Sequence, residues 1–176
     1  MPSTIGKIGM RTGLLIGIVL AGLLGGSWTG EAAEPAPVTV AVAGFDFVDS
    51  AGEAADQASR HAQQIAAFEE IVGQELAASR KFAVKALSCG QPRCTMEDPG
   101  VDRLAAAARS GGARYLLVGS LHKMSTLIGW AKLVIVDLDH EGRVCDRLLT
   151  YRGDTAEAWR HAAGFSARNL LQHCFP

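Results

Sequence analysis

Two carboxylates stand at the end of the first apolar segment, where an α/β sheet most often binds a ligand. That segment, residues 38–48, is almost continuously apolar and rich in β-branched residues, as expected of a strand covered on both faces. Asp46 and Asp49 lie at its end. Two neighbouring carboxylates can share a proton or hold a hard cation. A structural interpretation is simpler, and we expect it: Asp49 and Ser50 turn the chain, and Asp46 pairs with an arginine.

Basic side chains that can bind anions follow in the second half of the chain. His122 and Lys123 place an imidazole beside an ammonium between two expected strands, where they suit an anionic ligand. Arg147 and Arg152 lie in and just after the last expected strand, and a guanidinium can bind a carboxylate through two hydrogen bonds. The structural alternatives are a solvated hairpin segment for the first pair and a turn pair between Arg152 and Asp154.

These residues lead to three hypotheses of function. The first is a module without catalysis that binds an envelope protein or a small ligand at one end of its sheet. Its candidate binding residues are Asp46, Asp49, His122, Lys123, Arg147 and Arg152. The second is a periplasmic enzyme, either hydrolase-like with His122 and Asp46 or a thiol-redox protein with Cys89 and Cys94. The third is an assembly factor that oligomerises through an exposed edge strand.

The sequence lacks the common motifs of nucleotide-binding proteins, serine hydrolases and zinc proteases. The sequence has no Gly-rich phosphate loop, no G-x-S-x-G elbow, no H-E-x-x-H helix and no dinucleotide fingerprint. His61, His140, His161 and His173 lack metal-ligand spacing, so we expect neither a metal site nor a cofactor. The formal charge of −1 comes without the clustered basic face that nucleic-acid binding requires, so we expect no nucleic-acid partner.

Four cysteines, an even number, suggest disulfides in an exported chain. Three pairings are possible, and we favour Cys89–Cys94, which closes a small loop, together with Cys145–Cys174. A redox pair usually has two residues between its sulfurs, whereas four separate Cys89 from Cys94. We therefore expect both bridges to be structural.

Residues 1–32 have the pattern of a secretory signal peptide. Lys7 and Arg11 form a basic start, and the uncharged run over 12–28 is shorter than the roughly 20 apolar residues that cross a bilayer. Small residues at Gly30 and Ala32 suit cleavage after Ala32. We expect a periplasmic protein with no membrane span after cleavage; an uncleaved N-terminal anchor is the alternative. Residues 33–37 are then a short exposed lead-in and 38–176 a single globular domain.

The mature chain predicts an α+β fold with an α/β start. Strand patterns occupy 38–48, 82–87, 115–121, 130–138 and 143–151, and helical patterns run over about 56–79 and 101–109 and again after Asp154. We expect Asp98–Pro99 to begin the second helix and Asp154 to cap the third. The order β-α-β-α-β-β-β-α implies a mixed sheet of about five strands with helices packed on it, the first three strands parallel.

The order of these elements and several phrases resemble known families. GFDFVDS, LAASRKFAV, GARYLLVGSL and VIVDLDHEGRV are similar to the N-terminal domain of the Tol-system propeller protein, the curli secretion channel and the lipoprotein activators of peptidoglycan synthases. FDFVDS, HKMSTLIGWAKLVIVD and DRLLTYRGDTAEAW more closely resemble an uncharacterised family of secreted proteobacterial proteins, a domain of unknown function. The resemblance to the better-known modules implies scaffolding, assembly or partner binding rather than catalysis.

Overall fold

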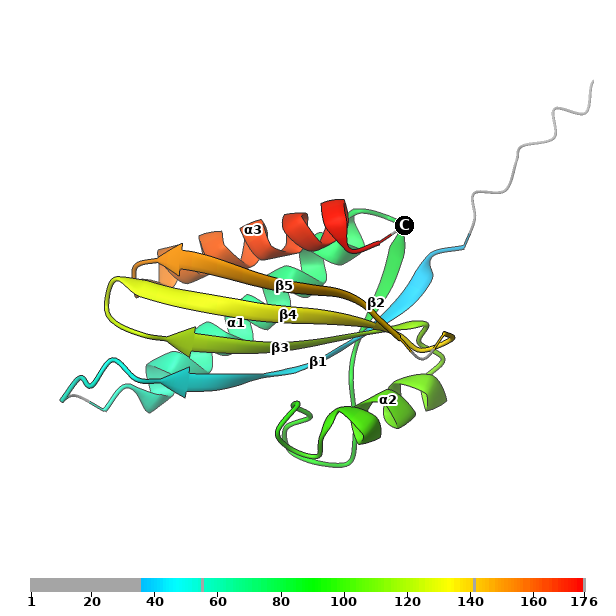
Figure 1. The fold of residues 1–176 in the computed structure, drawn as a ribbon, viewed down its shortest axis with the longest axis horizontal. Coiled ribbons are helices and arrows are strands. Elements are labelled where there is room, and N and C mark those ends of the chain that lie inside the picture. The colour runs from blue at the N-terminus through cyan, green and yellow to red at the C-terminus, as the bar shows by residue number, and fades with distance from the viewer. Residues whose placement is uncertain (1–35, 55, 141, 176) are drawn as a thin grey trace, which may run out of the picture. The chain divides into compact units, whose positions relative to one another are not determined.

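The computed structural model describes residues 36–54, 56–140 and 142–175, so the expected signal peptide lies outside the described residues. Within them the elements follow the predicted order (Figure 1). They are β1 (Val38–Asp49), α1 (Ala58–Ala78), β2 (Phe82–Ala86), α2 (Val101–Ser110), β3 (Tyr115–Lys123), β4 (Ile128–Asp137), β5 (Gly142–Arg152) and α3 (Ala156–His173). No helix in this part of the chain is both long and apolar enough to span a bilayer.

One five-stranded mixed sheet organises the domain, as the sequence predicts. The strand order is β2-β1-β3-β4-β5. β1 pairs in parallel with β2 and β3, and β4 pairs antiparallel with both β3 and β5. The register of β1 shifts between Val42 and Phe45, just where β2 ends beside it. The final half of β1 therefore has β3 on one side and no strand on the other.

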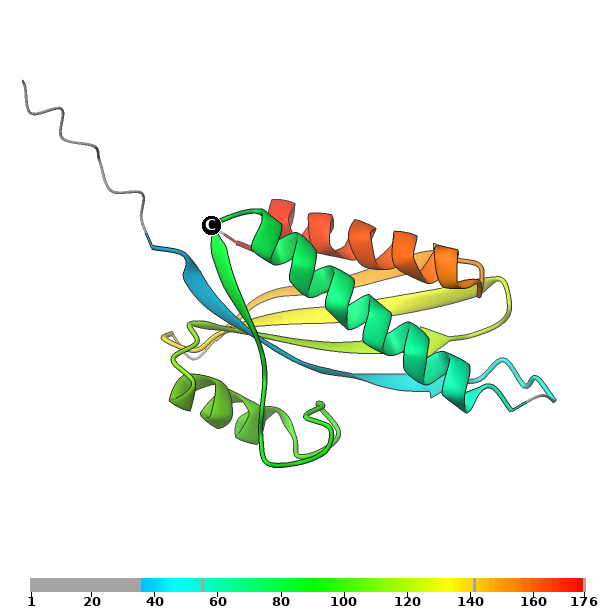
Figure 2. The same ribbon diagram turned by 180° about the vertical axis from the view of Figure 1, so that it is seen from behind.

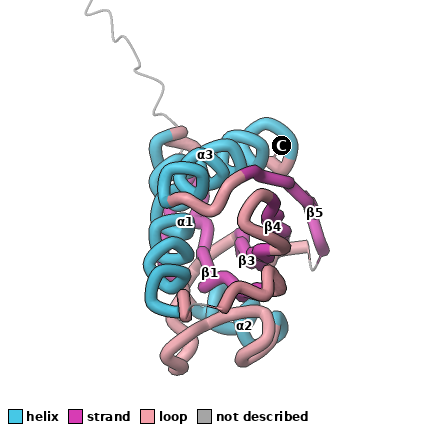
Figure 3. Tube along the Cα trace, turned by 90° about the vertical axis from the view of Figure 1, so that its left-hand side faces the viewer, coloured by secondary structure: helices cyan, strands magenta, loops and turns pink. Residues whose placement is uncertain are grey.

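The helices cover the two faces of this sheet unequally. α1 and α3 lie side by side along one face, and α2 lies on the opposite face (Figures 2 and 3). The larger core packs Phe68 of α1 and Trp159 of α3 against Leu117 and Leu133 of the sheet. The smaller core packs Leu104 of α2 against Leu116, Val118 and Val134. Because α2 has only ten residues, no helix covers the ends of β3 and β4 farthest from it on this face of the sheet (Figure 1).

Two helix starts differ from their predicted positions. The cap of α3 is Thr155, whose side chain accepts a hydrogen bond from the backbone N–H of Ala158, and not Asp154. The carboxylate of Asp154 instead forms ion pairs with Arg60 and Lys123, which lie on other elements. α2 begins after Gly100 rather than at Asp98–Pro99, whose peptide bond is cis and whose Asp98 carbonyl instead accepts a hydrogen bond from Thr95.

Both predicted disulfides are present, and the described chain has no free cysteine. Cys89–Cys94 closes the loop that follows β2. Cys145–Cys174 joins the edge strand β5 to the C-terminal end of α3. The second bridge therefore fixes the last helix to the sheet beneath it.

Candidate functional site

The sheet divides the predicted binding residues between its two faces. Side chains alternate along a strand, so the consecutive residues His122 and Lys123 must point in opposite directions. Lys123 shares its face with Leu117 and Leu121 of the larger core, whereas His122 shares the α2 side with Val118. The predicted site is therefore two separate groups. Asp49 and Lys123 lie on the α1/α3 side, and Asp46, His122 and Arg152 lie on the α2 side.

Lys123 is the centre of a buried ion cluster. Its side chain is 2 % exposed, and its ammonium lies 2.8 Å from Asp154 Oδ2 and 3.8 Å from Asp49 Oδ2. It also contacts the carboxylate of Glu53 and donates to Gln57 Oε1 at 2.9 Å. Burial opposes a charged lysine, but the hydrogen bonds to Asp154 and Glu53 outweigh it and raise the pKa of Lys123. The ammonium thus stays charged and ties four segments together.

Two carboxylates of this cluster, Asp154 and Glu53, stay ionised for the same reason. Burial would raise the pKa of Asp154, yet hydrogen bonds from Lys123 and Arg60 hold it below its ordinary value. Arg60 Nη2 lies 2.9 Å from Asp154 Oδ2. The hydrogen bond from Lys123 likewise lowers the pKa of Glu53. The turn pair between Arg152 and Asp154, the structural alternative for Arg152, does not form, because Asp154 is paired with Lys123 and Arg60.

His61 adds a buried imidazole beside the cluster. Its ring packs against Phe47 and stacks on Trp159 at 6.3 Å, and its Nδ1 lies 3.6 Å from Asp49 Oδ2. Burial, reinforced by the Lys123 ammonium, lowers the pKa of His61 despite the nearby carboxylates. The neutral imidazole therefore serves as a packed aromatic ring at the start of α1.

Sequence reasoning missed most of this cluster. Glu53, Gln57, Arg60 and His61 come from the loop after β1 and the first turns of α1, far along the chain from Lys123. No motif links them, since only the return of α1 across the sheet brings them together. The turn at Asp49 is confirmed, because its Oδ1 accepts a hydrogen bond from the N–H of Ala51.

The second group forms an uncovered surface on the α2 side of the sheet. The register places Val48, His122, Trp130 and Thr150 in one row across β1, β3, β4 and β5. The next row is Asp46, Ser120, Lys132 and Leu148. Ile128 and Arg152 pair beyond them at the end of β4 and β5. We call this surface the open sheet face: Val48, His122, Ile128, Trp130, Lys132, Leu148 and Arg152.

Three of its apolar side chains are exposed to solvent, and a fourth, Trp130, is half-buried. Leu148 is 65 % exposed, and Val48 and Ile128 are each 44 % exposed. The imidazole of His122 packs edge-on against the indole of Trp130 at 4.8 Å and accepts or donates a 2.7 Å hydrogen bond with Ser50 Oγ. His122 is thus held by neighbours on its own face and is not hydrogen-bonded to Asp46, as the hydrolase-like hypothesis would require.

The charges of the open sheet face are few. Lys132 lies 3.8 Å from Asp146, and Arg152 has no ion-pair partner among the described residues. Asp46 is 7 % exposed, and its Oδ2 has no hydrogen-bond partner in the part of the chain that the structure describes. The expected arginine pair for Asp46 does not form there. Arg93 donates instead to the carbonyl of Phe45.

Arg147 does not belong to either group. It lies on the α1/α3 side of β5, as does Tyr151, which contacts Trp159 of α3, and its Nε donates to Asn169 Oδ1 of α3 at 2.7 Å. This hydrogen bond lies near the Cys145–Cys174 bridge and, like it, joins β5 to α3. The guanidinium thus has a structural partner within the fold.

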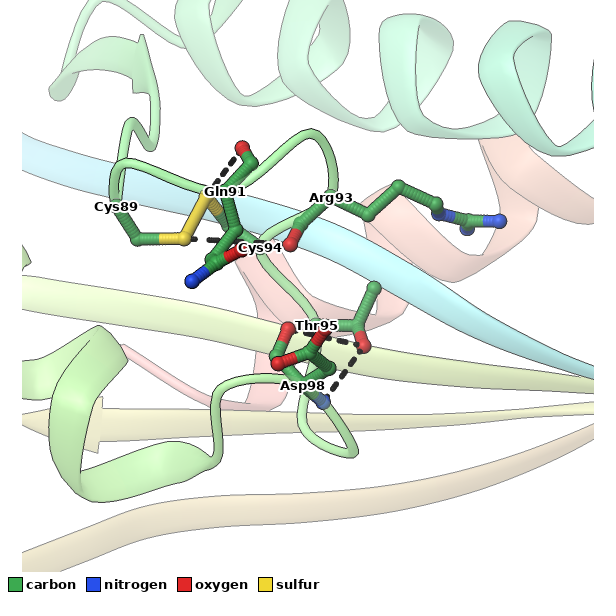
Figure 4. The surroundings of a disulfide bond; sticks show 6 residues. All are labelled: Cys89, Gln91, Arg93, Cys94, Thr95 and Asp98. Atoms are coloured by element: carbon green, nitrogen blue, oxygen red, sulfur yellow. Dashed lines mark hydrogen bonds between the residues drawn. A yellow bond between two sulfur atoms is a disulfide. The ribbon is translucent and has the colours of Figure 1, made fainter.

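A groove of about 670 Å³ lies between α1, the end of β2 and the Cys89–Cys94 loop. Arg93 extends from that loop, away from the disulfide, while Thr95 and Asp98 close the next turn by hydrogen bonds (Figure 4). At the same edge of β1, Glu69 Oε1 accepts a 2.6 Å hydrogen bond from the N–H of Phe45, whose carbonyl accepts one from Arg93, and burial raises the pKa of Glu69. Glu69 and Arg93 therefore replace the missing neighbour strand of β1.

The described residues hold no group of three or more histidine, cysteine, aspartate or glutamate side chains placed to bind a metal ion. The charged side chains on the α1/α3 side bind one another, and those around the groove bind the backbone of β1. The open sheet face differs from both, because it combines exposed apolar side chains with the exposed guanidinium of Arg152.

Comparison with known proteins gives a family and a fold. Residues 38–171 match the model of the DUF3280 family, described as "Protein of unknown function (DUF2380)". No curated protein matches the chain. Among solved structures, the PelC dodecamer from Paraburkholderia phytofirmans is similar with a TM-score of 0.52 and 15 % identity, over 81 % of this chain and 93 % of that one. At this identity the likeness concerns the fold alone.

Two further structures match the domain less closely. TolB from Acinetobacter baumannii has a TM-score of 0.48 and 16 % identity, covering 78 % of this chain and 28 % of TolB. The LpoB C-terminal domain from Escherichia coli has a TM-score of 0.42 and 14 % identity, covering 69 % and 87 %. The resemblance to a domain of unknown function, predicted from the sequence, is confirmed by the family match over residues 38–171.

Proposed function

The chain belongs to the DUF3280 family of unknown function, and we propose that it is a module without catalysis that binds a protein partner in the bacterial envelope. The binding surface is the open sheet face. Of the residues predicted from the sequence, His122 and Arg152 lie on this surface, and Asp46 is buried beneath it. Asp49, Lys123 and Arg147 act within the fold, since each is bonded to neighbouring elements.

One observation carries this proposal: apolar side chains from three strands are exposed together on a sheet face that α2 covers only in part. A single exposed leucine is ordinary on a protein surface, but a contiguous apolar patch on a folded monomer marks an interaction site. Leu148, Ile128 and Val48 are between 44 and 65 % exposed, and the ring of Trp130 lies among them. Covering them removes apolar surface from water, which favours association.

We place this module in the periplasm. Two observations support export: the signal-peptide pattern of residues 1–32 and the two disulfides, which are typical of oxidising compartments. The bridges also bear on the thiol-redox alternative, because it requires Cys89 and Cys94 to exchange readily with thiols. Thiol titration under mild reductant tests that alternative, and unreactive cysteines would exclude it.

Co-purification from the native envelope tests the proposed function. The full chain carries an affinity tag, and Leu148→Asp is compared with Phe165→Asp. Phe165 is a fitting control because it is 50 % exposed on α3, on the other side of the sheet. We expect proteins retained by the wild type to be lost with Leu148→Asp and kept with Phe165→Asp. Retention of every protein by Leu148→Asp, or none above an untagged background, would contradict the proposal.

Self-association through a sheet edge is a second candidate function. β5 has eleven residues and no strand partner on its outer side within the described chain, and such an edge can pair with another chain. The similar PelC structure is a dodecamer. Light scattering on the purified exported protein tests this candidate, which predicts a mass several times that of one chain. A monomer at every concentration would exclude it.

A further inference from the structure

The size, apolar content and charge of the open sheet face indicate what kind of partner it binds. The width of the face limits which element of a partner can cover it. The face spans β1, β3, β4 and β5, which are three strand spacings, or about 14 Å. An α-helix with its side chains is about 10 Å across. One helix therefore fits over the uncovered part of the sheet, beside the part that α2 occupies on the same face (Figure 1).

The apolar content of the face sets the second requirement. Val48, Trp130, Ile128 and Leu148 supply contacts from three strands. A helix that covers them needs apolar side chains on one side, spaced three and four residues apart. Its opposite side meets solvent and is polar. The occupant that this surface suits is thus an amphipathic helix.

The charged side chains of the open sheet face determine which charge the helix of the partner needs. Lys132 already has Asp146 as an ion-pair partner at 3.8 Å, and Asp46 is buried below the surface. Arg152 is exposed at the end of β5 with no ion-pair partner among the described residues. The unmatched exposed charge of the face is therefore positive. A guanidinium at such a position binds a carboxylate through two parallel hydrogen bonds.

A second copy of this chain does not meet these requirements. In a two-fold symmetric contact the same patch lies on both subunits. Two open sheet faces would bring two Arg152 guanidinium groups into one interface. Neither face would supply an unpaired exposed carboxylate, since Asp146 is paired with Lys132 and Asp46 is buried. Charge complementarity therefore favours a different protein.

We infer that the open sheet face binds an acidic amphipathic helix of a protein partner, with a carboxylate of that helix on Arg152 and its apolar side on Leu148, Trp130 and Ile128. This inference rests on the proposed function and adds the chemical class of the partner segment. It assigns Arg152 to recognition of charge and the apolar residues to the area of contact.

Three synthetic peptides test the inference with the purified, oxidised full-length exported protein. All three form amphipathic helices with the same spacing of leucines. They differ only in the residues that flank the leucines, which are glutamate in the first peptide, glutamine in the second and lysine in the third. Binding is measured by fluorescence anisotropy at low ionic strength. We expect the glutamate peptide to bind about 5-fold more tightly than the glutamine peptide, as for a partly exposed ion pair, and the lysine peptide to bind most weakly. High salt should reduce the difference.

Variants locate the effect at one residue. Arg152→Gln should remove the preference for the glutamate peptide, and Arg152→Glu should reverse it. Arg160→Glu, at an exposed position on α3, is the control and should leave the preference unchanged. Equal binding of the three peptides, or tightest binding of the lysine peptide, would overturn the inference while leaving the proposed function intact. Absence of binding by all three also overturns it, and co-purification with Leu148→Asp then decides the proposed function separately.

Discussion

At the scale of single residues, Lys123 makes the largest number of the ion pairs described above. The Lys123 side chain is only 2 % exposed, and among the described residues Asp49, Glu53, Asp154 and Gln57 surround its ammonium. The same bonds hold the loop after β1, the start of α1 and the start of α3 against the end of β3. The residue that the sequence marked for anion binding thus stabilises the fold.

Replacement of Lys123 by methionine should destabilise the domain by about 3 kcal/mol, because it leaves several carboxylates close together without their cation. Urea denaturation measures the loss. Lys132→Met, on the neighbouring strand β4, removes a half-exposed lysine and should cost no more than about 1 kcal/mol. Equal losses for the two variants would show that the Lys123 cluster contributes no more than a surface pair.

His61 should make stability depend on pH. Its folded-state pKa is lowered by burial and by Lys123, so below the ordinary histidine pKa of about 6.5 the unfolded chain binds the proton that the folded chain excludes. The free energy of unfolding should therefore fall as pH drops from 7 toward 5, with a slope approaching about 1.4 kcal/mol per pH unit from this group. Asp154 and Glu53, whose pKa values are lowered, lose their contributions only at lower pH.

The measurement compares His61→Phe with the wild type between pH 5 and pH 7. Phenylalanine keeps the ring packing against Phe47 and Trp159 but does not titrate. This variant should show a flatter pH profile, and His161→Gln, at an exposed position on α3, should leave the profile unchanged. A His61→Phe profile parallel to that of the wild type would contradict the role given to His61.

At the scale of elements, hydrophobic periodicity predicts the order of strands and helices, because each apolar run has the length and spacing of its element. The ends are less predictable. Thr155 rather than Asp154 caps α3, since Lys123 and Arg60 hold the Asp154 carboxylate and both lie far away in sequence. A local pattern contains no information about such long-range partners.

The candidate site, too, could be predicted only in part from local sequence patterns. The run YLLVGSL at 115–121 is apolar at nearly every position, so it does not reveal which side of the strand faces which helix. Alternation alone says that His122 and Lys123 diverge, but only α1, α3 and α2 decide what each one meets. The open sheet face likewise depends on the length of α2, which covers Val118 and Val134 but not Trp130 or Leu148.

The two disulfides should contribute unequally to stability. Cys145–Cys174 closes a separation of 29 residues and Cys89–Cys94 one of five. Loop-closure entropy gives about 3.5 kcal/mol for the longer loop and about 2 kcal/mol for the shorter. The variants Cys145→Ser/Cys174→Ser and Cys89→Ser/Cys94→Ser should differ in that order in urea denaturation. A larger loss from the short loop would show that its bridge acts by more than chain entropy.

At the scale of the whole molecule, two independent features point to export. The N-terminal pattern predicts cleavage after Ala32, and the bridges require an oxidising environment to form. Intact-mass analysis of the protein from the envelope fraction should give a chain that begins at Ala33 with both disulfides formed. A full-length reduced chain in the cytosol would contradict this proposal.

The two faces of the sheet differ in how completely the helices cover them. α1, α3, the Lys123 cluster and Cys145–Cys174 hold one face of the sheet closed. The other face, past α2, presents exposed apolar side chains on strands whose backbone is fixed by pairing. A surface that is formed before binding loses little conformational entropy when a partner covers it.

The most direct measurement of that claim is site-specific photo-cross-linking in living cells, with the photoreactive residue at position 148 or at position 165. Both positions hold exposed apolar side chains, but only Leu148 lies on the open sheet face. We expect a protein adduct at position 148 and none at position 165. No adduct at position 148, or the same adducts at both positions, would contradict it.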